Sequence, residues 1–521
     1  MKNGHLTKKN PNVLRQSVVV RSSAALFLAM FFLCVGVPAI SAHAEVHKVV
    51  DDDAEGGVLT VYRMSVTPAP VPVPALRHRL TVSPLDCQPG NAAAYYRRAL
   101  VDSEPETLWG QLSQQFGEEL DDWYSISSTP LSDLPLNRLR EASSLSEQNI
   151  ETHIRPATFR RDCDWDLGIE DMRGPQLVMV LLPEFHATRT ISRFLSLRTR
   201  VAIADGDFDK ALDHLRMNFR LAVNVGQEPL LICGLIGIAE ASIAQQQIIE
   251  WIAAEDSPNL YWALAELPHP LIDLNRAVQF EMSLGPRIFP FIADAETTKH
   301  APEEWSRLFA DALKDYSQLF DSPRLGPLDG AWRQAVVAAS SVAVYPHAKK
   351  RLIASGIAAE RIEQMPVGQV LAMDTLQEWN RISNEVQKQW YLPFHLSRKQ
   401  NTADLFRYDG PEDAIRRGYG FLLAAGLLPS LEAVRSADAR IEWQMRAVQV
   451  IEALRLHAAN TAKLPAKLTD VTEVYVPVNP ATNNAYQYRL ENDTAILDLP
   501  FTDGFAGIAY RFEIKLDNAA P

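Results

Sequence analysis

The feature that most constrains the fold is a succession of amphipathic helical patterns from about residue 90 to about residue 459. In the clearest of them, Phe208–Val223, apolar residues recur at steps of three and four, which places them on one face of an α-helix. Glu378–Trp390 and Arg440–Leu454 repeat this spacing. Prolines at 258, 268, 270, 286 and 290 predict that residues 259–291 form short helical pieces. We therefore expect a mainly α fold, built as an array of helical hairpins.

The two ends of the remaining chain have a different pattern. Val58–Val66 has the composition of a strand, and we expect the proline-rich Thr67–Pro74 to be a polyproline II spacer between it and the main body. At the other end, a long helix over Leu431–Ala459 precedes segments that alternate like strands, at 473–476, 485–490, 494–497 and 509–516. The expected domains are an entry segment (45–89), a helical domain (90–430) and a small α+β C-terminal module (431–521).

The first 44 residues have the composition of a secretory signal peptide. Five basic residues and no acidic ones precede the apolar run 24–37, and Pro38 follows its last residue. The small residues of Ala42-His43-Ala44 are acceptable to a signal peptidase. We expect cleavage before Glu45 and export to the periplasm or cell envelope. Retention as an anchor is the alternative, because residues 22–44 carry no formal charge. After cleavage no membrane span is expected, because the best later apolar run, Pro229–Ala239, has only eleven residues.

Charge and missing motifs narrow the class of protein. Without the leader, 46 Lys and Arg stand against 64 Asp and Glu, a net charge of −18. Such a surface repels phosphate backbones, so nucleic acid is not an expected partner. The sequence lacks the H-E-x-x-H, G-x-S-x-G, P-loop, dinucleotide-glycine and C-x-x-C signatures. We accordingly expect no metal ion and no cofactor.

Three cysteines remain after signal cleavage. Cys87 and Cys163 lie in polar, turn-like surroundings and form the expected disulfide, since export permits one. Cys233 lies in an apolar run and is expected to be a buried free thiol. Three aspartates surround Cys163 and disfavour its thiolate, so a polar loop is preferred over a metal site or a reactive cysteine there.

A cluster of basic side chains forms the candidate ligand-binding site. His186, Arg189, Arg193 and Arg200 lie within one predicted helix, and Arg189 and Arg193 share a face of it. Together they could bind an anion. The alternative is that these arginines pair with carboxylates of neighbouring helices.

Four glutamates, Glu240, Glu250, Glu266 and Glu281, lie in strongly apolar helical stretches. Two carboxylates that face one cleft could hydrolyse a glycan, whereas solvated or ion-paired carboxylates need no catalytic role. A cleft holding two of them within about 5–9 Å would favour a hydrolase, and a groove without such a pair would favour binding.

The segment that contains Gly206, Phe208 and Ala211 resembles the middle of a tetratricopeptide repeat. In that family the glycine ends the first helix and the small alanine lets the second helix approach closely. Asn218 stands where the family has another alanine, and no second copy follows at a spacing of about 34 residues. The resemblance implies one helical hairpin. The alternating acids from Asp205 also match the start of a calcium loop, but its required Gly and Glu are absent.

Several short motifs occur in a fixed order: Pro89–Leu100, Cys163–Trp165, Gly206–Phe208, Pro258–Leu264, Leu267–Asp273 and Met365–Val370. This order resembles that of a family of large exported helical proteins common in planctomycete bacteria. The resemblance implies a helical body and an envelope or periplasmic location, and it implies no activity and no catalytic residue.

The C-terminal end has a second resemblance. The helix to Ala459, the pair Leu464-Pro465 and the segment Val478–Tyr488 are similar to the helix-plus-sheet end of type II secretion pseudopilins. Asn479 and Asn484 stand where those proteins carry Asp-Pro and Gly. The resemblance implies a shared small fold and not a shared role.

The sequence therefore predicts an exported, non-catalytic binding or scaffolding protein of the bacterial envelope. Its expected partner is an envelope protein or peptide, because stacked helical hairpins form concave surfaces that suit such ligands. The alternative is a hydrolase that acts on an envelope polymer through paired carboxylates.

Overall fold

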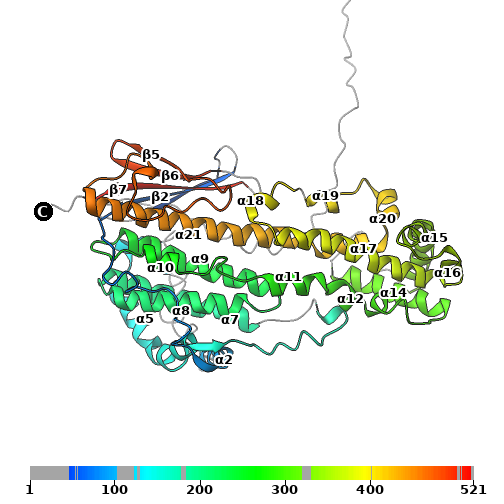
Figure 1. Ribbon diagram of the computed structural model, residues 1–521. Helices are drawn as coiled ribbons and strands as arrows, with labels where there is room; N and C mark the ends of the chain where they lie inside the picture. Colours follow the sequence, from blue (N-terminus) through cyan, green and yellow to red (C-terminus); the bar gives the residue numbers. More distant parts are fainter. Residues whose placement is uncertain are drawn as a thin grey trace, which may run out of the picture. The chain divides into compact units, whose positions relative to one another are not determined.

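The computed structural model describes residues 46–517 except 53, 55–56, 102–121, 126–128, 178–182, 320–329, 401, 501–504 and 506 (Figure 1). The predicted signal peptide lies outside the described residues. The chain divides into two compact units, which are described separately below. Among the described residues, the first comprises Asp294–Trp379 and Ala403–Gly426, and the second comprises residues 46–293, Asn380–Thr402 and residues 427–517. The predicted fold class is confirmed: the protein is mainly α, with a small α+β module at its C-terminal end.

Three consecutive helices form the centre of the second unit. They are α7 (Pro183–Ala204), α8 (Phe208–Gly226) and α9 (Leu231–Ala253), and they run side by side in Figure 1. Because α9 is apolar on every face, it is buried as a core helix. It is the one helix among the described residues that is long and apolar enough to cross a membrane, but 67% of that window is buried inside the protein.

The contact between α8 and α9 depends on a glycine pair. A Cβ added at Gly237 would lie 2.5 Å from the carbonyl oxygen of Ala222 and 2.8 Å from the Cα of Gly226. The two backbones therefore approach more closely than any larger residue at 237 permits. This close approach stabilises the core on which the rest of the unit is built.

The predicted hairpin between α7 and α8 is present. Gly206 has a φ of 70°, and the carboxylate of Asp207 accepts a hydrogen bond from the backbone N–H of Lys210, which caps α8. Asp205 pairs with Arg140. Ala211 is fully buried where the two helices meet. The acids thus form a helix cap and an ion pair, while the likeness to a tetratricopeptide repeat stays a prediction.

The other helices of this unit are shorter, apart from α21. Pro268 and Pro270 lie between α10 and α11, Pro286 lies inside α12 and Pro290 begins α13. A π-helical turn over Ile150–Ile154 follows α5. The bounds are α2 (Ala92–Val101), α5 (Leu136–Asn149), α6 (Arg155–Thr158), α10 (Tyr261–Ala265), α11 (Asn275–Met282), α12 (Leu284–Ile288), α13 (Pro290–Ala293), α18 (Phe394–Ser397) and α21 (Ser430–Thr461).

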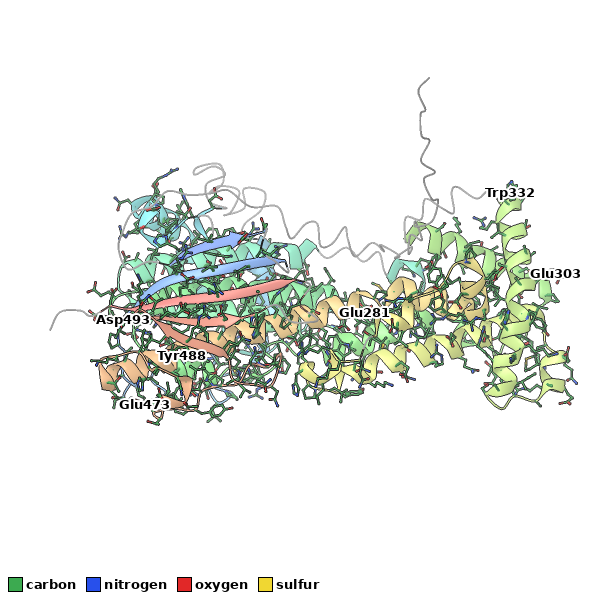
Figure 2. The ribbon with its side chains drawn as sticks, turned by 90° about the horizontal axis from the view of Figure 1, so that it is seen from above. Glu281, Glu303, Trp332, Glu473, Tyr488 and Asp493 are labelled. Atoms are coloured by element: carbon green, nitrogen blue, oxygen red, sulfur yellow. The ribbon has the colours of Figure 1, made fainter. Side chains whose placement is uncertain are left out.

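A five-stranded sheet joins the two ends of the chain. Its order is β1-β2-β7-β6-β5, in which β2 and β7 are parallel and the other neighbours antiparallel. In Figure 2 the two blue strands from the N-terminal segment lie beside the red strands of the C-terminal end. The entry segment and the C-terminal module, which we expected to be separate domains, therefore share one sheet. The strands are β1 (His47–Asp51), β2 (Val58–Val66), β5 (Gln487–Glu491), β6 (Thr494–Leu499) and β7 (Ile508–Leu516).

The proline-rich segment after β2 is not the spacer that we expected. Its residues Thr67 and Ala69 are buried. The guanidinium of Arg455 on α21 donates to the carbonyl oxygen of Thr67 over 2.9 Å, and Ala69 donates its N–H to the carbonyl of Arg455. A buried ion pair between Arg455 and Glu452 positions that guanidinium. The extended backbone is thus fixed against α21 by hydrogen bonds that sequence composition does not reveal.

The segment 473–476, predicted as a strand, is a loop. Pro477 follows it directly and Pro480 comes three residues later. Each proline lacks the N–H that a ladder of strand hydrogen bonds needs. The loop lies between the end of α21 and the sheet. It contributes one wall of the cleft described below.

The sheet packs on α21 through aromatic rings. Trp443 of α21 stacks on Phe505 with ring centroids 4.7 Å apart and meets Tyr510 of β7 edge-on. Tyr486 donates its hydroxyl to the carbonyl oxygen of Trp443 over 2.8 Å. These contacts hold one side of α21 under the sheet.

The first unit is a set of helices around two buried tryptophans, Trp305 and Trp379. Arg351 forms a bidentate pair with the buried carboxylate of Asp374, over 2.7 and 2.6 Å. Gly418, at a φ of 83°, lies against this pair and interrupts α20. The helices are α14 (Pro302–Leu319), α15 (Gly330–Ala354), α16 (Ala359–Glu363), α17 (Val367–Trp390), α19 (Ala403–Phe406) and α20 (Pro411–Leu427), of which α17 passes into the second unit after Trp379.

A short parallel pair, β3 (Gln88–Asn91) and β4 (Arg160–Asp162), lies beside α2 in the second unit. Cys87 precedes β3 and Cys163 follows β4, so the parallel register puts them at opposite ends of the pair. Since Gln88 is level with Arg160, the two cysteines are about four residue steps apart, roughly 13 Å at about 3.3 Å per residue, beyond the limit of about 7 Å between Cα atoms for a disulfide. The expected disulfide is absent, and both thiols are free.

Candidate functional site

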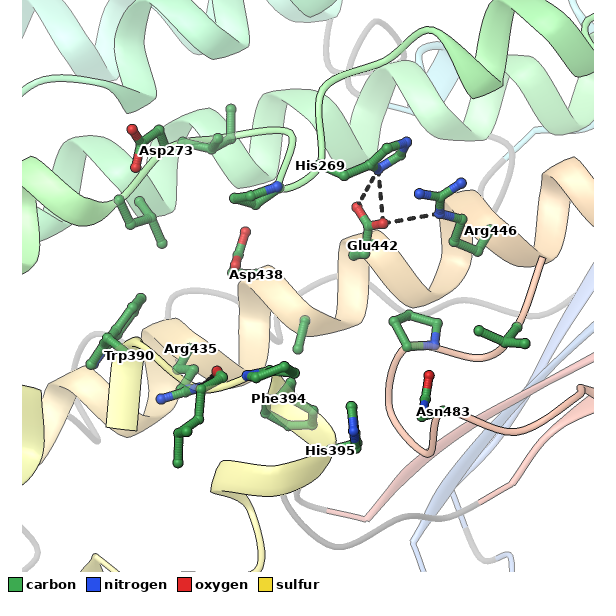
Figure 3. Close-up of a pocket in the computed structure, with 18 of the residues that line it drawn as sticks. His269, Asp273, Trp390, Phe394, His395, Arg435, Asp438, Glu442, Arg446 and Asn483 are labelled. Carbon is green, nitrogen blue, oxygen red and sulfur yellow. Dashed lines mark hydrogen bonds and ion pairs between the residues drawn. The ribbon is translucent and has the colours of Figure 1, made fainter. Parts of the chain in front are cut away.

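A cleft of about 630 Å³ opens in the second unit (Figure 3). Ligand pockets in proteins typically enclose about 300–1,000 Å³. Four segments that are distant in the sequence form its walls: residues 269–275 after α10, residues 390–395 around the start of α18, one face of α21, and the loop 475–483. The helix α21 thus packs under the sheet on one side and faces the cleft on another.

A charged stripe on α21 lines the cleft. Arg435, Asp438, Glu442 and Arg446 follow one another at steps of three, four and four, which places them on one face of a helix. Other faces of the same helix carry buried apolar side chains such as Ile441. Because α21 is held by its apolar contacts, these four charges are presented from a rigid element.

Glu442 is fully engaged. Its carboxylate lies 2.8 Å from Nδ1 of His269 and 3.1 Å from Nε of Arg446, as the dashed lines in Figure 3 mark. The two contacts come from different segments, since His269 belongs to the loop after α10. This group closes one end of the cleft and neutralises the Glu442 charge locally.

Asp438, one turn earlier, has a different environment. Its Oδ1 atom is shut away from solvent and has no hydrogen-bond partner among the described residues. Burial raises the pKa of Asp438 to about 7; the neighbouring charges of Glu442 and Asp273 also raise it, and Arg435 opposes them. The carboxyl is therefore both poorly solvated and repelled by its neighbours.

Arg435 does not neutralise Asp438. Its Nη2 donates to the carbonyl oxygen of Leu392 over 2.6 Å, and its guanidinium lies 5.4 Å from the ring centroid of Trp390. Its Nη1 atom has no hydrogen-bond partner among the described residues. The arginine thus braces the wall at 390–392, and within the described part of the chain Oδ1 of Asp438 receives no hydrogen bond from it.

The remaining lining is mostly apolar and stiff. Phe394 stacks on Phe505, with ring centroids 5.1 Å apart. At the rim, the Tyr475 side chain is 70% exposed, while its carbonyl accepts a hydrogen bond from the hydroxyl of Tyr261. Four prolines also line the cleft: Pro270, Pro393, Pro477 and Pro480. Apolar walls around a few charged groups are typical of ligand-binding sites.

The predicted anion site is distributed over several environments on α7. Arg200 is fully buried and forms an ion pair with Glu250, with 2.7 Å between Nη2 and Oε1. Arg193 lies over the ring of Tyr124, 4.8 Å from its centroid. For Arg200 the alternative of pairing with a neighbouring helix is therefore what the structure contains.

The other two members of that cluster are Arg189 and His186. Arg189 lies close enough to Glu240 for its charge to lower the pKa of that carboxyl. The side chain of His186 lies outside the described residues. None of the three arginines, whose side chains are described, lines the cleft, and an anion site on α7 stays a prediction.

The four glutamates do not meet in the cleft. Glu250 pairs with Arg200, and Glu266 accepts from Nε of Arg79 over 2.9 Å. Burial raises the pKa of Glu281 to about 7 and that of Glu240 to about 8. The cleft instead contains a pair that sequence reasoning missed, Asp438 and Glu442, although a charged stripe at helical spacing on an otherwise apolar helix was a signal for it.

Two of the free cysteines, Cys163 and Cys233, offer no nucleophile. Burial raises the pKa of Cys163 to about 12, so its thiol stays protonated at neutral pH. Cys233 is fully buried, which confirms the prediction of a buried thiol. Within the described ranges, no three His, Cys, Asp or Glu side chains gather in a way that could hold a metal ion.

Comparison of the chain with protein-family models, with curated proteins and with solved structures gives no match. The functional argument therefore rests on the residues of this chain alone.

Proposed function

We propose that this chain is an exported binding protein of the bacterial envelope, whose cleft in the second unit receives a segment of a partner protein or peptide. The observation that carries the proposal is the cleft itself, with apolar walls and one unpaired carboxylate at Asp438. Its walls come from elements held by buried contacts, so little ordering is needed on binding. The signal-like leader supports the envelope location.

Hydrolysis of an envelope polymer is the second candidate, and a specific observation favours it. Asp438 has its pKa raised to about 7, as a general acid requires, and Glu442 lies one turn away. Against it, Glu442 is held by both His269 and Arg446, so it is not free to activate water or to attack a sugar. Binding is therefore the function that the geometry supports better.

A site-specific crosslink in intact cells tests the binding proposal. A photoreactive benzoylphenylalanine replaces Tyr475 at the rim, and in a matched control it replaces Leu85, which is 95% exposed and does not line the cleft. We expect the Tyr475 variant to attach reproducibly to one segment of an envelope protein, identified by peptide mapping, and the Leu85 variant not to do so. Absence of any protein attachment at 475, or the same products from both positions, would contradict the proposal.

Hydrolysis assays on the purified wild-type protein and on two further variants separate the two candidates. If envelope glycans are cleaved by the wild-type protein, and cleavage is lost in both Asp438→Asn and Glu442→Gln, the chain is a hydrolase. If no cleavage occurs while the crosslink forms, binding is supported.

A further inference from the structure

The acids of the cleft differ in what neutralises them. Glu442 is paired with His269 and Arg446. Asp273 is exposed and accepts a hydrogen bond from the backbone N–H of Asn275 over 3.0 Å. Asp438 alone among the three combines a buried oxygen that lacks a partner with negative neighbours. Of the three acids, Asp438 is therefore the one whose charged form a bound ligand would stabilise most.

The kind of ligand follows from what disfavours the Asp438 carboxylate. A neutral hydroxyl or amide donor would supply the missing hydrogen bond but would leave the repulsion from Glu442 and Asp273 in place. A cationic group supplies the hydrogen bond and cancels the repulsion, and charge-assisted hydrogen bonds are also the stronger ones. Arg435 opposes this repulsion through its charge, but it donates to Leu392 and lies over Trp390, and Oδ1 of Asp438 stays without a hydrogen-bond partner among the described residues.

We propose that the cleft recognises a lysine or arginine side chain of the partner segment, whose cationic group binds the Asp438 carboxylate. This inference rests on the proposed function and specifies its ligand chemistry. The charge is complementary, and the walls suit the rest of such a side chain, since the methylene stem of a lysine or arginine packs along apolar surface. Tyr475 and the cleft prolines supply that surface next to the charged stripe on α21.

The test is binding of short labelled peptides to the full mature chain. The probes are fluorescein-labelled Ala-Pro-Xaa-Ala-Pro-Ala amides with Lys, Arg, Gln or Glu as Xaa, measured by fluorescence anisotropy up to millimolar concentration. We expect the Lys and Arg peptides to bind at least about 10-fold more tightly than the Gln peptide, the ratio typical of a charge-assisted hydrogen bond. The Glu peptide should bind most weakly.

Two isosteric variants locate the effect. Asp438→Asn should reduce the Lys-to-Gln ratio to about 2-fold or less. Asp493→Asn removes the same charge at the exposed turn between β5 and β6, and it should leave the ratio unchanged. Should Asp438→Asn fail to fold, as thermal unfolding would show, the ratio measured on the wild-type chain decides.

The outcomes separate this inference from the proposed function. Equal binding of the Lys and Gln peptides, or no binding of the Lys and Arg peptides at any concentration, overturns the recognition of a cation. If the Tyr475 crosslink still attaches to one envelope segment, the proposed function stands while this inference falls. If that crosslink also fails, both fall.

Discussion

A carboxyl group buried in the helical core provides the sharpest physical test of the structure. The carboxyl of Glu240 on α9 is 0% exposed, and both of its oxygens are shut away from solvent. Burial raises its pKa from 4.5 to about 8, against smaller opposing effects of Thr188 and Arg189. The folded protein therefore holds this proton at a pH at which the unfolded chain has released it.

The sign of the pH dependence follows directly. Below pH 4.5 Glu240 is protonated in both the folded and the unfolded state, so it adds no pH dependence to the free energy of unfolding. As the pH rises from 4.5 to about 8, only the unfolded chain gains by ionising, so the free energy of unfolding falls. At pH 7 the accumulated loss is about 3 kcal/mol, at 1.36 kcal/mol per pH unit.

The variant Glu240→Gln removes the titrating group and keeps its size. We expect the difference in unfolding free energy between variant and wild type to shift in favour of the variant by up to about 3 kcal/mol between pH 4.5 and pH 7. Denaturant unfolding followed by tryptophan fluorescence, with both proteins at each pH, measures this difference, and the contributions of other titrating groups cancel.

Glu303→Gln is the matched control, since Glu303 is exposed on α14 (Figure 2). Its stability should run parallel to that of the wild type over the same pH range. A Glu240→Gln curve that also runs parallel would refute the reasoning, because it would mean that Glu240 is ionised and solvated in the folded protein.

Three further predictions concern the buried ion pair, the close helix contact and the free cysteines of the second unit. Arg200→Met and Glu250→Gln should each lower the unfolding free energy by about 3–5 kcal/mol, because each leaves a buried partner behind, and the double variant should cost less than their sum in a double-mutant cycle. Gly237→Ala should lower the thermal unfolding temperature at a cost of about 1–3 kcal/mol, because the added Cβ meets the backbone of α8. Ellman's reagent should label Cys87 in the native protein and Cys233 only after unfolding; a native protein in which Cys87 does not react would revive the disulfide.

The helices could be predicted because their signal is local. The apolar spacing over Phe208–Val223 and Leu431–Ala459 produces α8 and α21, since a face that repeats every 3.6 residues must be buried along a helix. The prolines between 258 and 290 likewise predicted that this stretch forms only short helices, because a proline removes one backbone donor wherever it stands. The strand at Val58–Val66 could also be predicted, because its signal, the composition of the segment, is local as well.

The candidate site could be predicted only in part. The sequence offered Arg200 as an anion ligand or an ion-pair partner, and Glu250 as a catalytic acid or an ion-paired carboxylate. It could not show that these two residues, fifty positions apart, pair with each other. It also passed over Asp438, because an aspartate on a long helix has no special meaning until its surroundings are known. Burial and neighbouring charge, which make that carboxylate unusual, come from other segments.

By itself the sequence determined what depends on near neighbours: the helical class, the helix ends, the signal-like leader and the acidic surface. Only the tertiary structure decided that β2 pairs with β7, which lies more than four hundred residues later, and that the proline-rich segment is fixed to α21 at Thr67 and Ala69. It also placed Cys87 and Cys163 at opposite ends of a strand pair. It also brought the four walls of the cleft together. The reason is physical: periodicity and charge act over one or two helical turns, whereas pairing, burial and the pKa of a carboxyl depend on whichever distant segments the folded core places beside it.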